Sequence, residues 1–156
     1  MSSSTDRERL QQAVSQLATQ IEELKKYIEI AQNRVLAIQN EINEIRMSLE
    51  AINSLEKASF NEAILALDRR GYAFIKATIP PQKSILVTIG NDYVVALPLD
   101  KARNLLNARE KDLISMLRDA EADLKKLLDL YNQMNRKLRE YLAALTQSGG
   151  AAPAKG

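Results

Sequence analysis

The chain carries two long stretches in which apolar residues recur at alternating spacings of four and three, and neither stretch contains a glycine or a proline. A spacing that averages 3.5 residues turns one narrow stripe of a helix toward a partner helix, as in a coiled coil. We call these stripes the seams. The first seam is Leu10, Val14, Leu17, Ile21, Leu24, Ile28, Ala31, Val35, Ile38, Ile42, Ile45, Leu49 and Ile52, and the second is Leu113, Leu117, Ala120, Leu124, Leu127, Tyr131, Met134, Leu138, Tyr141 and Leu145.

The first seam predicts a helix over residues 10–56, preceded by a flexible N-terminal segment, residues 1–9. Thr5 followed by Glu8 has the form of a capping box, which predicts that the helical conformation itself starts near Asp6. Such a helix is several times longer than the usual helix of a globular protein. It would expose its seam in isolation and therefore needs a partner.

The second seam predicts a helix over residues 100–145. Asp100 follows Pro98 and is placed to cap the start of this helix. The tail, residues 146–156, is rich in glycine, alanine and other small residues and is expected to be disordered.

Residues 62–98 have a different character, because β-branched and aromatic residues alternate there with glycines and prolines. This pattern is typical of short strands and turns. Glycine, asparagine and aspartate tolerate a positive φ angle, which tight hairpin turns require. We expect strands at 63–68, 72–79, 85–89 and 93–97, with one turn at Arg69, Arg70 and Gly71 and another at Gly90, Asn91 and Asp92.

Two hairpins between helices of nearly equal length would let the helices fold back on each other. The predicted fold is mainly α with a small β insertion: a long antiparallel two-helix coiled coil connected by two β-hairpins, in a single domain over residues 10–145.

Composition excludes several classes of function. The chain has 22 Lys and Arg against 20 Asp and Glu, a net charge of +2, and both signs are interleaved along the helices, unlike the basic face of a nucleic-acid-binding protein. Histidine and cysteine are absent, which removes the usual nucleophiles, bases and zinc ligands. We therefore expect no enzymatic activity, no metal site and no cofactor.

No apolar run is long enough to cross a membrane, and the polar N-terminus is unlike a signal peptide, so we expect a cytoplasmic protein without a membrane partner.

The hairpins carry more apolar surface than two isolated hairpins can bury, and their strands have unpaired edges. We therefore expect the chain to assemble with other chains through this segment. Packing of the hairpins back on the helices is the alternative, and it would leave part of this surface exposed. The predicted assembly residues are Ile64, Leu65, Ile75, Ile79, Ile85, Val87, Ile89, Val94 and Val95.

A second apolar cluster is expected where the two ends of the chain meet. Leu128, Leu130 and Leu142 flank the second seam and widen its apolar stripe. A widened stripe at the open end of a coiled coil can bind exposed hydrophobic surface of another protein. A wider local contact between the two helices explains any single one of these residues equally well.

With this layout in place, the chain resembles an α-class prefoldin subunit over nearly all of its length except the tails. The stretch that carries most of the resemblance covers residues 63–102, AILALDRRGYAFIKATIPPQKSILVTIGNDYVVALPLDKA. It is similar to the hairpin pair of that family, and two hairpins rather than one favour the α class.

The resemblance implies an ATP-independent holdase chaperone that works in a hexamer of two alpha and four beta subunits, with the hairpins building the central platform. Unfolded client proteins would be captured at the ends of the coiled coil and passed to a group II chaperonin. The sequence leaves open how the chaperonin docks. It could contact the same apolar ends, or charged groups such as Arg7, Arg9, Lys137 and Arg139. The predicted client-binding residues, called the tip residues below, are Leu10, Val14, Leu17, Leu138, Tyr141, Leu142 and Leu145.

A function of another class also fits the sequence. A structural coiled-coil or filament-forming scaffold protein would use the hairpins to polymerise, and its helix ends would bind nothing. Closed particles in electron micrographs would favour the chaperone, and open filaments would favour the scaffold.

Overall fold

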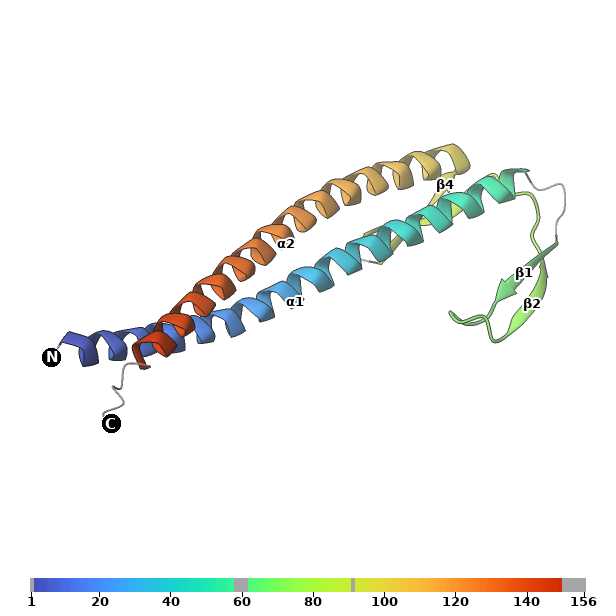
Figure 1. Ribbon diagram of the computed structural model, residues 1–156. Coiled ribbons are helices and arrows are strands. Elements are labelled where there is room, and N and C mark those ends of the chain that lie inside the picture. Colours follow the sequence, from blue (N-terminus) through green and yellow to red (C-terminus); the bar gives the residue numbers. More distant parts are fainter. Residues whose placement is uncertain (1, 58–61, 91, 150–156) are drawn as a thin grey trace. The chain divides into compact units, whose positions relative to one another are not determined.

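The computed structural model describes residues 2–57, 62–90 and 92–149, which form two long helices and two antiparallel hairpins (Figure 1). The predicted fold class is thereby confirmed. In chain order the elements are α1 (Ser2–Lys57), β1 (Glu62–Ala66), β2 (Phe74–Thr78), β3 (Ser84–Gly90), β4 (Tyr93–Pro98) and α2 (Leu99–Gly149).

The chain divides into two compact units. Unit 1 comprises residues 1–38 and 116–156, so it pairs the N-terminal part of α1 with the C-terminal part of α2. Unit 2 comprises residues 39–115 and holds the end of α1, both hairpins and the start of α2.

In unit 1 the helices bury the predicted seams. Every seam residue of this unit is buried or half-buried, as expected for helices that pair through a heptad stripe. The heptad prediction is therefore confirmed in this unit. The buried members are Leu17, Ile21, Leu24, Ile28, Ile38 and Ala120.

In unit 2 the seam of α2 is longer than predicted. Leu106 lies one heptad before Leu113 and is only 8% exposed, and Leu99 is half-buried. The alternating spacing of four and three that runs from Leu99 through Leu106 to Leu113 also passes through Arg103 and Glu110. Because two seam positions are charged, an apolar periodicity does not reveal this part of the seam.

The helix ends also differ from the expectation. The first helix begins at Ser2, so Thr5 lies inside α1 and cannot be its N-cap; the capping-box prediction is wrong, and the described residues of segment 1–9 belong to the helix. Serines are only mildly unfavourable in a helix and do not stop it here. The second helix begins at Leu99, which places Asp100 in its first turn rather than at the cap. It extends to Gly149, and the rest of the expected tail, residues 150–156, lies outside the described residues.

The second hairpin agrees closely with the predicted strands. In the first hairpin β1 ends at Ala66 and β2 begins at Phe74, so residues 67–73 lie outside the strands and the turn is longer than predicted. In the first hairpin β1 and β2 are in antiparallel register, with Leu65 opposite Ile75. In the second, Val87 lies opposite Val95, and a register shift occurs between Thr88 and Gly90. The φ angles are +70° at Gly71, +132° at Gly90 and +62° at Asp92, which confirms the positive φ angles expected for these turn residues.

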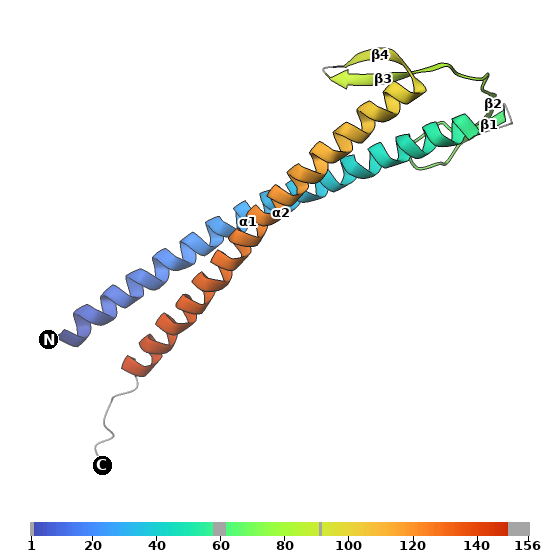
Figure 2. The ribbon, with the colours of Figure 1, turned by 90° about the horizontal axis from the view of Figure 1, so that it is seen from above.

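Within unit 2 the second hairpin places one face over the helices. Val87 is 6% exposed, and its neighbours on the same face, Ile85 and Val95, are half-buried. Ile85 and Val87 line a groove together with Ile52 of α1 and Leu106 of α2. Figure 2 shows β3 and β4 beside the first turns of α2. One face of this hairpin therefore packs against the helices, which is the alternative that the sequence analysis considered.

Candidate interaction surfaces

The tip residues all lie in unit 1, where they come from the beginning of α1 and from the last turns of α2. Leu17 is buried, whereas Leu142 is 46% exposed. The other tip residues are half-buried. All of these side chains except Leu142, which flanks the seam, fill the seam. All except Leu17 still present part of their apolar surface to solvent.

The part of α1 that carries tip residues has an unusual polar composition. Residues 10–21 contain no charged side chain, and their polar members are glutamine, serine and threonine. Covering such a surface with another protein does not require desolvation of an ion, which is the most costly desolvation in protein interactions. The local chemistry is therefore suited to contact with apolar surface.

Sequence reasoning missed a groove on the side of the helices in unit 1. Tyr27 and Ile30 are 63% and 65% exposed and line a cavity of about 220 Å³. Ala31 and Ala120 also line this cavity, and these small seam residues leave space that a leucine would fill. Tyr27 and Ile30 lie outside the seam positions, so a search for heptads passes over them.

The predicted assembly residues differ in exposure. Five are exposed, three are half-buried, and Val87 is buried within the chain itself. The exposed members are Ile64 at 68%, Leu65 at 45%, Ile75 at 51%, Ile89 at 53% and Val94 at 55%.

Both faces of the first hairpin are open to solvent. Ile64 lies on one face with Phe74, which is 61% exposed, and Leu65 lies on the other face opposite Ile75. Two proline residues of the connector, Pro80 and Pro81, line a groove of about 700 Å³ together with residues of β1 and the end of α1. The prediction omitted other exposed apolar residues of the hairpin segment. They are Leu67, Tyr72, Phe74, Leu86 and Tyr93.

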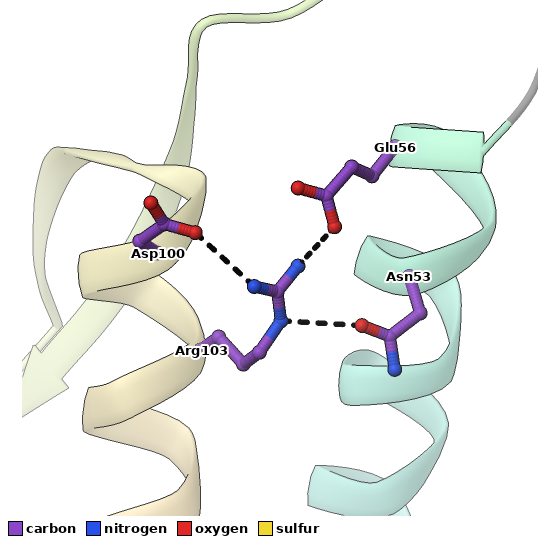
Figure 3. Close-up of polar contacts among 4 residues, drawn as sticks. All are labelled: Asn53, Glu56, Asp100 and Arg103. Atoms are coloured by element: carbon purple, nitrogen blue, oxygen red, sulfur yellow. Dashed lines mark hydrogen bonds and ion pairs between the residues drawn. The ribbon is translucent and has the colours of Figure 1, made fainter.

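Near the end of α1 and the start of α2, Arg103 of α2 connects the two helices (Figure 3). Its Nε donates a hydrogen bond to Asn53 Oδ1 at 3.2 Å, and its Nη2 donates to Glu56 Oε2 at 2.5 Å. A third bond, from Nη1 to Asp100 Oδ1 at 3.2 Å, holds the guanidinium group against its own helix. One side chain thus ties the end of α1 to the start of α2.

No helix within residues 2–57, 62–90 and 92–149 is both long and apolar enough to cross a membrane.

Comparison with known proteins agrees with this geometry. The prefoldin family, described as prefoldin subunit, matches residues 24–144. A prefoldin subunit alpha from Metallosphaera sedula is 32% identical over 122 residues, covering 78% of this chain and 84% of the relative. A prefoldin subunit alpha from Sulfurisphaera tokodaii is 27% identical and covers 96% of this chain and 100% of the relative. The chain therefore belongs to the prefoldin family, and it is of the archaeal alpha type.

A solved structure supports the fold independently. A chain of filamentous PFD from Methanocaldococcus jannaschii superposes with a TM-score of 0.53 at 17% identity, covering 81% of this chain and 98% of that one. Membership of the family supports a chaperone-type role as a prefoldin subunit.

Proposed function

We propose that the chain is the alpha subunit of an ATP-independent holdase, which captures non-native proteins at the tip residues and passes them to a group II chaperonin. One observation carries this proposal. Apolar side chains from both ends of the chain gather in unit 1, and they are only partly buried there. Apolar surface left exposed in this way is typical of a protein interaction site.

Capture without nucleotide follows from many weak contacts. Full burial of a leucine side chain contributes about 1.5–3 kcal/mol of free energy. A leucine that is already partly buried contributes less on binding a client, about 1 kcal/mol per side chain. Several such helix ends on one particle raise the effective concentration of the binding surface and hold a client that a single end would release. Release to a chaperonin then needs no chemical step in this chain.

Assembly through the hairpins is the second part of the proposal. We infer a hexamer of two alpha and four beta subunits, in which the exposed assembly residues are covered by neighbouring subunits. The exposure of Ile64, Ile75 and Val94 in the single chain supports this inference, as do the unpaired edges of both two-stranded sheets.

A filament-forming scaffold is the competing function, and one observation favours it. The solved neighbour is described as filamentous, and edges of two-stranded sheets can add further strands without closing a ring. Electron microscopy of the assembled protein separates the two functions, because the holdase predicts closed particles and the scaffold predicts open filaments.

The decisive experiment measures aggregation of a denatured protein in the presence of the complex and without nucleotide. The full complex is expected to suppress aggregation. Deletion of the residues before Gln20 and after Asn132 is expected to abolish suppression while the mass of the complex, corrected for the deletion, stays that of the same oligomer. Equal protection by the truncated complex would show that the tip assignment is wrong.

A point variant gives a sharper test. Leu142→Ser is expected to weaken client binding roughly fivefold per helix end, since about 1 kcal/mol of apolar contact is lost. Leu36→Ser is the matched control, because Leu36 is a leucine of unit 1 that is 56% exposed and lies outside the tip residues. We expect the control to bind clients as well as the unsubstituted complex.

Delivery to the chaperonin is tested separately. A client held by the complex is expected to refold when a group II chaperonin and ATP are added, and to stay bound when ATP is added alone. Refolding without the chaperonin would contradict the proposed transfer.

A further inference from the structure

The apolar seam by itself does not specify how far α2 lies along α1. Every seam position of α1 from Leu10 to Ile52 carries an aliphatic residue or alanine, and the seam of α2 from Leu113 onward is also apolar. A displacement by one heptad would again bring apolar residues against apolar residues. Contacts along the apolar seam alone therefore do not distinguish one register from the next.

Two charged seam residues of α2 make contacts in unit 2 that depend on the register. Glu110 accepts a hydrogen bond from Arg46 Nε at 2.5 Å, and the side chain of Glu110 is 19% exposed. Arg103 donates to Asn53 and Glu56, and its side chain is 26% exposed. Arg46 and Asn53 are one heptad apart on α1, as are Arg103 and Glu110 on α2. Both contacts therefore belong to one and the same register.

A slip of one heptad is unfavourable in either direction. One direction brings Arg46 beside Arg103, which sets two positive charges against each other and separates each from its carboxylate on the facing helix. The other direction brings Arg46 beside Leu117 and carries Arg103 past Lys57, where α1 ends. Both guanidinium groups then lose their partners on the facing helix.

We propose that Arg46, Arg103 and Glu110 specify the register in which α1 and α2 pair, as polar residues at seam positions do in other coiled coils. A slip of seven residues displaces one helix by about 10 Å along the other. These three residues thereby determine which residues of the two helices face each other. The proposal does not depend on what the tip residues bind.

Pairs of spin labels test the register directly, because the chain has no cysteine of its own. Asn40→Cys and Lys101→Cys place labels on exposed positions of α1 and α2 within unit 2. The labelled chain is mixed with an excess of unlabelled chain, so that only distances within one molecule are measured. We expect a single distance between the labels.

Adding Arg46→Glu reverses the preference. The new carboxylate is repelled by Glu110 in the original register and attracted by Arg103 in the slipped one. We expect a second population of molecules, in which the labels have moved by about 10 Å along the helix axis. Combining Arg46→Glu with Glu110→Arg restores an opposite-charge pair and is expected to return most molecules to the original distance.

Lys26→Glu is the control, because it makes the same charge reversal at an exposed position of the same helix. It is expected to leave the single distance unchanged. The proposal is overturned if Arg46→Glu keeps the original distance. It is also overturned if Arg46→Glu loses that distance and the charge-swapped variant fails to restore it.

Discussion

The carboxylate of Asp68 organises the turn of the first hairpin. It accepts hydrogen bonds from the backbone N–H groups of Arg70 at 2.8 Å, Tyr72 at 2.9 Å and Ala73 at 3.0 Å. Desolvation of the carboxyl acts to raise its pKa, but these N–H groups and that of Gly71 favour the charged form and bring the pKa below the ordinary value of 3.8. Gly71 completes the turn, because its φ angle is +70° and a Cβ there would lie 3.1 Å from the ring of Phe74.

Removal of this carboxylate is expected to loosen the turn without unfolding the helices. In Asp68→Ala the amide hydrogens of Arg70, Tyr72 and Ala73 should exchange with solvent roughly tenfold faster at neutral pH, because each loses its hydrogen-bond acceptor. Amide exchange followed by NMR measures this. Asp92→Ala, in the turn of the second hairpin, is the control and should leave these three amides unchanged.

The pH dependence of the same turn has a defined sign. Because the pKa of Asp68 is lowered in the folded chain, the stability that its charge contributes is fully present above the unfolded value near 3.8 and is lost as the pH falls through the lower, folded value. Protection of the three amides should therefore persist at pH 5 and decline only in more acidic solution. A decline centred above pH 4 would contradict the hydrogen-bonding account.

At the scale of elements, the sequence predicted the helices and strands well, because heptad spacing and turn residues are local signals. The start of the α2 seam was missed, because Arg103 and Glu110 interrupt the apolar spacing. Their charged partners on α1 lie 47 and 64 positions earlier in the chain, which no local pattern reveals. The sequence also could not predict which of the assembly residues are exposed and which are buried. Alternation along β3 shows that Leu86 and Val87 face opposite sides, but only the packing shows which side meets the helices.

The second hairpin offers a matched pair of neighbours that tests this packing. Val87 is 6% exposed and Leu86 is 74% exposed. Val87→Ala should lower the free energy of unfolding by about 1–2.5 kcal/mol, because it removes buried methyl groups and leaves a cavity. Leu86→Ala should change it by less than about 0.5 kcal/mol in the isolated chain. Urea denaturation at one fixed protein concentration measures both; equal effects would show that this face does not pack on the helices in solution.

At the scale of the whole molecule, the two kinds of apolar surface call for different partners. The tip residues keep part of their surface available in unit 1, which suits transient contact with varied clients. The first hairpin leaves large aliphatic side chains such as Ile64 exposed on both faces, and such a surface is unfavourable in a chain that stays alone. We therefore expect assembly to depend on the hairpins and client capture to depend on the helix ends, so that each can be removed without the other.

Ile64→Ser tests the assembly half of this separation. Ile64 is 68% exposed, so the substitution should hardly change the folding of the single chain, whereas burial of its side chain by a neighbouring subunit would contribute about 2 kcal/mol. Mixing with a single-hairpin beta subunit should then require roughly 30-fold higher concentration to form the complex, as measured by native mass spectrometry.

Tyr27→Ser removes a side chain of similar exposure, 63%, from α1 and should leave the mass of the complex unchanged. A complex that forms equally well with Ile64→Ser would place the assembly interface elsewhere, and a mass that grows without limit as concentration rises would favour the filament.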